Sequence, residues 1–185
     1  EHRIFASALG CAVGLKNPTY GSIDIGVNSV VAAQHPHIAI LDGHEVQTHG
    51  NPYAHLVLRG GQQGTNYSKE HIKIAEKEME KHGIQNPAII VDASHDNCKV
   101  DGKKFHRQQI KVVREVLETM KNENELRKVV KGFMIESFIK EGNQKIDPTH
   151  PENIDLGGLS LTDPCLDWEQ TEELLLELNE AQKNL

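Results

Sequence analysis

Four short apolar runs in this sequence each end at a side chain that can bind a ligand or take part in catalysis. The first three lead into Lys16, Arg59 and His95, and the fourth leads into Glu136. Histidine is the commonest metal ligand and exchanges protons near neutral pH. A carboxylate directly after an apolar run costs free energy unless it is paired or bound to a metal. Together with Asp163, which precedes a proline in a loop, His95 and Glu136 suit a divalent metal such as Mn, Fe or Co.

Lys16 and Arg59 are candidates for binding an anion. Arg59 is followed by Gly60 and Gly61, whose backbone would let an anion approach N–H groups beside a guanidinium that suits phosphate. Ordinary structural roles stay open at this point. A lone histidine at a strand end is often structural, a glutamate there often caps a helix, and both cations could simply form ion pairs. The wide spacing of the three possible metal ligands is not a motif in itself.

The elements that must position these residues repeat at a regular interval. Their four strand ends are separated by 43, 36 and 41 residues, and each run is followed by a polar loop and an amphipathic segment. This order predicts an α/β fold built from β–loop–α units with parallel strands. In a (β/α) barrel the carboxyl ends of the strands converge on one active site. A closed barrel needs eight such units, and this sequence contains four.

The boundaries follow from periodicity and from capping and turn residues. We expect strands over residues 12–16, 55–58, 88–93 and 129–135, and helices over residues 22–34, 68–82, 104–121 and 167–183. A short strand at 38–41 should lead into a turn at Asp42 and Gly43. Ser68 is expected to cap one helix, and Asp167 with Gln170 to form a capping box on the last. The first ten residues resemble the tail of a helix, so we expect part of the fold to lie upstream.

Composition narrows the class of protein. The 185 residues, 37% hydrophobic and 25% charged, fit one soluble globular domain. The net charge of −7 argues against non-specific nucleic-acid binding, which needs a basic surface. No apolar stretch is long enough to predict a membrane span. The three cysteines, Cys11, Cys98 and Cys165, lack the spacing of a zinc site and favour a reduced, cytoplasmic setting.

Five motifs occur in order along nearly the whole chain. They are Gly14-Leu15-Lys16-Asn17, Leu58-Arg59-Gly60-Gly61, Asp92-Ala93-Ser94-His95-Asp96-Asn97, Ile135-Glu136-Ser137 with Glu141-Gly142-Asn143-Gln144, and the segment from Ser160 to Glu169. They resemble GFKN, LRGG, D-x-SH-x-N, V-ES with EGNQ, and SITDACIGWE of the type I 3-deoxy-D-arabino-heptulosonate 7-phosphate (DAHP) synthase family.

This resemblance implies a (β/α)8 TIM barrel, of which residues 1–185 would be the C-terminal half of a single catalytic domain, covering about strands five to eight with their helices. It implies condensation of phosphoenolpyruvate with erythrose 4-phosphate to DAHP and phosphate, the first step of the shikimate pathway to the aromatic amino acids. His95, Glu136 and Asp163 match three ligands of a divalent metal (Mn, Fe, Co or Zn). Lys16 and Arg59 match phosphoenolpyruvate-binding positions, and we expect Lys16 and His95 to be catalytic.

The family's fourth metal ligand, an early Cys, and its Lys-Pro-Arg-Thr and Gly-Ala-Arg motifs do not occur in this sequence. We therefore expect the isolated chain to be inactive. Its two open sheet edges should make it pair with itself or with the missing half-barrel. Residues 42–49 look shorter than the family's regulatory insert, so sensitivity to an aromatic amino acid stays open. The alternatives are a non-catalytic half-barrel that binds or regulates, and a sister synthase that acts on arabinose 5-phosphate.

Overall fold

The computed structural model describes residues 1–185, apart from the side chain of Leu41. Four parallel strands form its central sheet in the order β1-β4-β5-β8. Their bounds are Val13–Lys16 (β1), Ala54–Leu58 (β4), Ile89–Asp92 (β5) and Val130–Met134 (β8). Neighbouring strands in the sheet are also successive along the chain, and each connection contains a helix. The predicted β–loop–α order is therefore confirmed.

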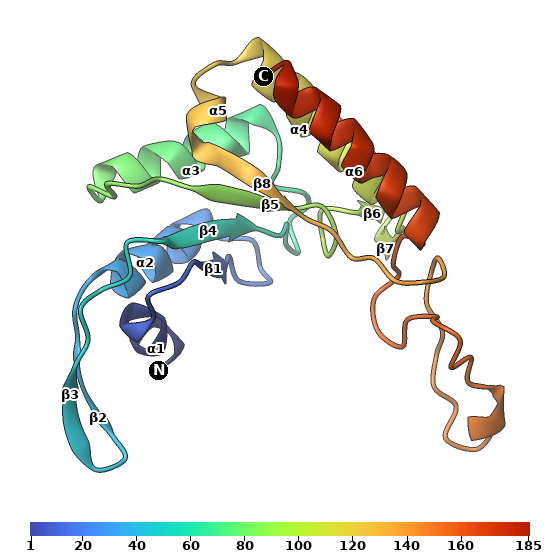
Figure 1. Ribbon diagram of the computed structural model, residues 1–185, viewed down its shortest axis with the longest axis horizontal. Coiled ribbons are helices and arrows are strands. Elements are labelled where there is room, and N and C mark those ends of the chain that lie inside the picture. Colours follow the sequence, from blue (N-terminus) through green and yellow to red (C-terminus); the bar gives the residue numbers. More distant parts are fainter.

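The helices pack against one face of this sheet. They are α1 (His2–Ala8), α2 (Ile23–Gln34), α3 (Lys69–Lys81), α4 (Gln108–Asn122), α5 (Leu126–Val129) and α6 (Trp168–Lys183). Val30 of α2 and Ile72 of α3 join Leu56 and Ile89 of the strands in one buried apolar cluster. Figure 1 shows α4 and α6 side by side, and Nε and NH2 of Arg114 on α4 donate hydrogen bonds to the carboxylate of Glu177 on α6.

The opposite face of the sheet carries the chemistry. Side chains alternate along a strand, so Leu56 and Leu58 face the helices whereas Val57 faces away. Val57 is in register with Lys16 of β1 and with Ile90 of β5. Asp92 lies two residues after Ile90 and therefore shares its face. Lys16 and Asp92 thus lie on the face that would line the interior of a barrel.

Two small hairpins and one 3-10 turn complete the fold. Strands β2 (Ile38–Leu41) and β3 (His44–Gln47) pair antiparallel, and Asp42 and Gly43 between them have φ angles of +49° and +78°. The predicted strand and its turn are confirmed. Strands β6 (Lys99–Val100) and β7 (Lys103–Lys104) form a second hairpin, and η1 covers Pro151–Asn153. The first hairpin and the segment around η1 extend away from the sheet (Figure 1).

One helix start and one helix cap were predicted wrongly, and one strand begins a single residue later than expected. The helix expected from about Lys104 begins at Gln108, because residues 99–104 form the β6–β7 hairpin around a turn at Asp101 and Gly102. The strand expected from Val129 begins one residue later, because the preceding turn is the short helix α5. Ser68 stands at the first end of α3 but makes no capping bond, since its hydroxyl donates to Glu70 instead.

The capping box before α6 forms only in part. Asp167 Oδ1 accepts a hydrogen bond from the backbone N–H of Gln170 at 2.7 Å, as expected of an N-cap. The side chain of Gln170 donates to Glu141 rather than returning to the cap. Among the described helices, none combines the length and the apolar character that a membrane span requires.

Two isoleucines of α3 offer a matched test of this packing. Ile72 is fully buried, whereas the side chain of Ile74 on the same helix is 48% exposed. We expect Ile72→Ala to lower the free energy of unfolding by about 2–5 kcal/mol, because it leaves a cavity in the core. Ile74→Ala should change it by less than about 0.5 kcal/mol. Urea denaturation measures both values, and equal losses would show that the helix packs differently.

Candidate metal and anion site

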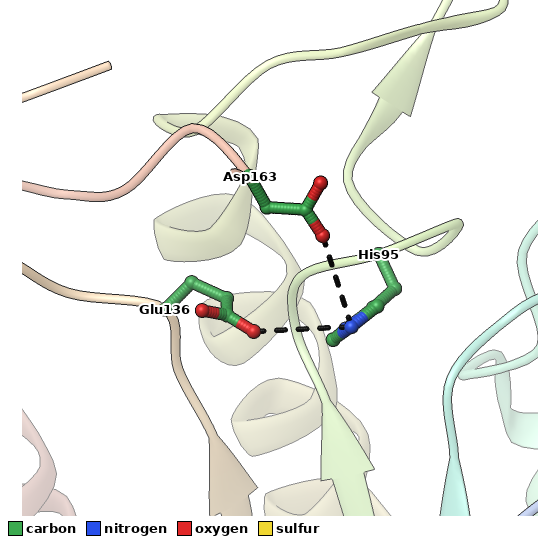
Figure 2. A group of neighbouring side chains, drawn as sticks. All are labelled: His95, Glu136 and Asp163. Carbon is green, nitrogen blue, oxygen red and sulfur yellow. Dashed lines mark ion pairs between the residues drawn. The ribbon is translucent and has the colours of Figure 1, made fainter. Parts of the chain in front are cut away.

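The predicted ligands lie at the carboxyl edge of the sheet. His95 follows β5, Glu136 follows β8, and Asp163 lies in the loop before α6. Ligand atoms of these three side chains all lie within 4.8 Å of one another. His95 Nε2 is 3.8 Å from Glu136 Oε1 and 3.8 Å from Asp163 Oδ2, and Figure 2 shows the three side chains pointing toward a common centre. The structure brings the three residues together, as the sequence predicted.

Asp92 sets the orientation of His95. It is the last residue of β5, its side chain is fully buried, and its Oδ2 lies 2.8 Å from His95 Nδ1. Although the contact is short, His95 Nδ1 forms no hydrogen bond with any described residue in this structure. Asp92 occupies the Nδ1 side of the ring and leaves Nε2 facing Glu136 and Asp163, as in the carboxylate–histidine–metal arrangements of metalloproteins. His95 itself has a φ of +48°, a left-handed conformation that costs energy and is common at functional sites.

The same carboxylate also holds Lys16. Asp92 Oδ2 accepts a hydrogen bond from Lys16 Nζ at 2.9 Å, and Oδ1 accepts one from the backbone N–H of Ser94 at 3.0 Å. Burial raises the pKa of Asp92, but its contacts with His95 and Lys16 outweigh burial and hold the pKa below its usual range. Asp92 therefore stays ionised and links the predicted metal side of the site to its cationic side.

Glu136 and Asp163 are held by different means. The buried amide of Gln109 on α4 grips the backbone of Glu136, accepting from its N–H at 2.8 Å and donating to its carbonyl at 3.1 Å. Asp163 is held through its side chain, because Lys104 Nζ of β7 lies 2.6 Å from both of its carboxylate oxygens. Neither Gln109 nor Lys104 was singled out from the sequence, since each lies far along the chain from the residue that it holds.

The donor set fits a divalent metal. One imidazole nitrogen and two carboxylate oxygens are ligands that Mn, Fe and Co accept. With bonds of about 2.1 Å, ligand atoms around a metal lie roughly 3.0–3.4 Å apart, so the 3.8 Å separations would close by a few tenths of an ångström. Asp163 could keep its contact with Lys104 through one oxygen and offer the other to the metal.

Arg59 lies beside this cluster in a loop that buried asparagines fix. Its backbone N–H donates to Asn17 Oδ1 at 2.9 Å, and the next N–H, of Gly60, donates to Asn66 Oδ1 at 2.7 Å. Asn97 donates to the carbonyl of Leu58 at 3.0 Å and to that of Asp92 at 2.8 Å. These amides tie together the ends of β1, β4 and β5, which fixes where the Arg59 side chain starts.

Gly60 is required at this point. It has a φ of +72°, and a Cβ atom there would lie 2.7 Å from the backbone carbon of Asp96. The loop after β4 is therefore pressed against the loop after β5. The Arg59 guanidinium then meets Asp96, with its NH1 2.5 Å from Asp96 Oδ2, and Lys99 contacts the other oxygen of the same carboxylate. Burial raises the pKa of Asp96, but these two cations lower it further than burial raises it.

Residues 1–176 match the model of a family described as the DAHP synthetase I family. The chain belongs to this family. It is 39% identical over 185 residues to the Trp-sensitive phospho-2-dehydro-3-deoxyheptonate aldolase of Enterobacter agglomerans, a match that covers 97% of the chain and 50% of that relative. It is 40% identical over 183 residues to the Tyr-sensitive aldolase of Salmonella typhimurium, covering 96% of the chain and 48% of the relative.

A solved structure of this DAHP synthase family agrees with the fold. The phospho-2-dehydro-3-deoxyheptonate aldolase of Francisella tularensis SCHU S4 superposes with a TM-score of 0.83 at 34% identity, over 97% of the chain and 50% of that structure. The predicted family and the TIM-barrel fold class are confirmed. The chain spans about half the length of these relatives and matches their C-terminal half.

Glu141 anchors the loop that connects Glu136 to Asp163. Its carboxylate accepts hydrogen bonds from Gln170 Nε2 at 2.8 Å, from Arg107 Nε and NH2 at 3.0 and 2.8 Å, and from His106 Nε2 at 3.1 Å. The bond from Gln170, followed by those from Arg107 and His106, lowers the pKa of Glu141 to about 2. The loop is thus fastened to the starts of both α4 and α6.

The contacts of Glu141 predict that its carboxyl titrates at an unusually low pH. Because the folded pKa of Glu141 is depressed, its stabilising effect is full above the unfolded value of about 4.3 and is lost as the pH falls toward about 2. NMR titration of the Glu141 carboxyl should give a midpoint near pH 2 in the native chain. In Arg107→Met the midpoint should rise toward about 4.3. An unchanged midpoint in that variant would mean that Arg107 does not hold the loop.

Proposed function

We propose that residues 1–185 are the C-terminal half of a single TIM-barrel catalytic domain and carry half of a DAHP synthase active site. The whole enzyme would condense phosphoenolpyruvate with erythrose 4-phosphate to give DAHP and phosphate. The observation that carries this proposal is the convergence of His95, Glu136 and Asp163 at the edge of the sheet where Lys16 and Arg59 also end. Family membership and the aldolase names of the relatives support it.

In this proposal His95, Glu136 and Asp163 hold a divalent metal among Mn, Fe, Co and Zn, and one histidine with two carboxylates favours the first three. When bound, the metal would supply a Lewis acid for the aldehyde oxygen of erythrose 4-phosphate. Lys16 and Arg59 would neutralise the carboxylate and phosphate of phosphoenolpyruvate and hold its reacting carbon near that aldehyde. Asp92 would keep Lys16 and His95, our proposed catalytic pair, in fixed relative positions.

The setting of the site follows from charge and cysteine chemistry. The net charge of −7 argues against a nucleic-acid partner, and it is compatible with a local cationic pocket for small phosphorylated substrates. Cys11, Cys98 and Cys165 are all free thiols, which supports a reducing, cytoplasmic compartment. The match of Glu141-Gly142-Asn143-Gln144 to the family motif favours erythrose 4-phosphate over the arabinose 5-phosphate of the sister synthase.

Metal binding tests the proposed ligands directly. Mutation of an outer-shell partner costs about 10- to 100-fold in metal affinity, so we expect His95→Ala to lose more than roughly 100-fold in Mn²⁺ affinity by calorimetry. His150→Ala is the matched control, because His150 is an exposed loop histidine and should bind Mn²⁺ as the native chain does. Equal affinities in the two variants would contradict the metal site.

The same metal-loaded chain, mixed with phosphoenolpyruvate and erythrose 4-phosphate, should release no phosphate above background, since the family's fourth ligand and two anion-binding motifs do not occur in its sequence. Turnover would show that this half is competent alone. Phosphoenolpyruvate binding without turnover is the expected result, and it is shared with the non-catalytic binding module. Addition of the other half of a family barrel separates the two, because only the proposed function predicts turnover.

The open edges of the sheet predict association. Strands β1 and β8 each have only one neighbour in the sheet. A groove of about 620 Å³ runs along β8 and α6, with Phe133, Ile135, Leu175 and Leu178 in its lining. Unpaired parallel edges and apolar grooves favour a partner. We propose that this face pairs with a second copy of the chain or with the half-barrel that the relatives carry in the rest of their length.

Two neighbouring leucines of α6 distinguish this association from non-specific hydrophobic aggregation. Leu175 lines the groove, whereas Leu176 is more exposed and lies outside its lining. Light scattering of the isolated chain should give a multiple of its 20.6 kDa mass. Leu175→Asp should reduce that mass, and Leu176→Asp should leave it unchanged. A monomer at every concentration, or equal effects of the two substitutions, would contradict self-association through the groove.

A further inference from the structure

The Arg59 guanidinium, which the proposed function assigns to substrate binding, is already engaged by a carboxylate. Asp96 Oδ2 lies 2.5 Å from Arg59 NH1, and the two side chains are only 9% and 11% exposed. Asp96 occupies the second variable position of the motif D-x-SH-x-N. The motif therefore does not require a negative charge at this position. An Arg59–Asp96 pair alone has no net charge, and its attraction for an anion would be weak.

Lys99 changes this balance. Its Nζ contacts Asp96 Oδ1, the oxygen that Arg59 leaves free. Lys99 is the first residue of β6, three positions after Asp96, so the turn between them sets the distance. The three side chains together carry one net positive charge. We call Arg59, Asp96 and Lys99 the charge cluster.

The geometry keeps the cluster together. The backbone N–H of Asp96 donates to the carbonyl of Arg59 at 3.1 Å, and the absence of a side chain at Gly60 lets the two loops touch. Asp96 engages NH1 of Arg59, and a guanidinium has five N–H donors. Arg59 can therefore bind Asp96 and an incoming phosphate or carboxylate at the same time.

We propose that Asp96 and Lys99 set the affinity of Arg59 for the anionic groups of phosphoenolpyruvate. Asp96 holds the guanidinium in place and weakens its field, and Lys99 offsets the charge of Asp96 so that the cluster stays cationic. Both are positioning residues that act through Arg59. The inference rests on the proposed function, and it adds two residues that the family motifs leave unassigned.

The charges predict opposite effects for the two residues. Removing one unit charge at about 7 Å from an anion changes its binding roughly threefold at the dielectric constant of water and roughly fiftyfold at an effective value of about 20. Lys99→Met should therefore weaken phosphoenolpyruvate binding by a factor in this range, and Asp96→Asn should strengthen it. The double variant should return close to the native affinity. If Asp96 and Lys99 had only structural roles, each single substitution would weaken binding, and the double variant would bind more weakly still.

Calorimetric titration with phosphoenolpyruvate at fixed ionic strength tests this. Lys103→Met is the matched control. Lys103 is an exposed lysine on the neighbouring strand β7, so this substitution removes the same charge from outside the cluster. Lys99→Arg should retain native affinity, since it keeps the charge. Lys103→Met and Lys99→Arg leave the buried carboxylate of Asp96 unchanged. Their comparison with Lys99→Met therefore tests the proposal even if Asp96→Asn disturbs folding.

The outcomes separate the inference from the proposed function. No phosphoenolpyruvate binding by the native chain, or equal binding by native chain and Arg59→Met, would overturn both. Binding that depends on Arg59 but is weakened equally by Lys99→Met and Lys103→Met would overturn the charge cluster alone. So would weaker binding in folded Asp96→Asn. Weakening confined to Lys99→Met, with recovery in the double variant, is the expected result.

Discussion

The candidate site depends on one buried carboxylate. Asp92 ends the central strand β5 and is fully buried, so its charge has to be met within the protein. Two groups meet it: Lys16 from β1, two strands away, and His95 from the loop that follows Asp92. This contact fixes a cation of the predicted anion site and a ligand of the predicted metal site to the same atom. The strained φ of His95 is the cost of returning the ring to that carboxylate.

The backbone around Asp92 is fixed by a second constraint, the pairing of buried N–H and C=O groups. Loops that leave parallel strands cannot continue the ladder, and here the amides of Asn17, Asn66 and Asn97 replace it. Asn66 also joins Asn17 directly, with a hydrogen bond of 3.0 Å. Because the three amides bridge three strand ends, a shift of one loop would break bonds in the other two. The backbone positions from which the side chains of these loops extend are therefore fixed.

Much of this arrangement could be predicted from the sequence. Parallel strands present their carboxyl ends at one edge, so reactive residues at the ends of four apolar runs had to converge. His95 and Glu136 were identified in this way, Asp163 was added from a loop, and the family motifs matched all three. The signal for Asp92 was also present, since a carboxylate at the end of an apolar strand needs a partner, but its partners could not be read from spacing.

Other partners were hidden because side-chain pairing across a sheet leaves no local pattern. Gln109 grips Glu136 across 27 residues, and Lys104 reaches Asp163 across 59. The β6–β7 hairpin that positions Lys104 was missed, and the next helix was expected to begin at Lys104, the last residue of β7. The turn at Asp101 and Gly102 is a hairpin signal, but the flanking strands are only two residues long and carry lysines rather than alternating apolar residues.

The contacts that order the site all lie within this chain, and this bears on what a partner would add. Asp92 holds His95 and Lys16, Gln109 holds Glu136, and Lys104 holds Asp163. Such a half-site is ordered without a second half-barrel. Yet Lys16, Glu136 and Asp163 keep between 31% and 37% of their side-chain surface exposed, on a face of the sheet that no helix of the described chain covers. Charge–charge interactions strengthen when water is excluded. Closing the barrel would therefore have two effects. It would add the fourth ligand and the anion-binding motifs that this sequence lacks, and it would enclose side chains that are already in place in a drier site.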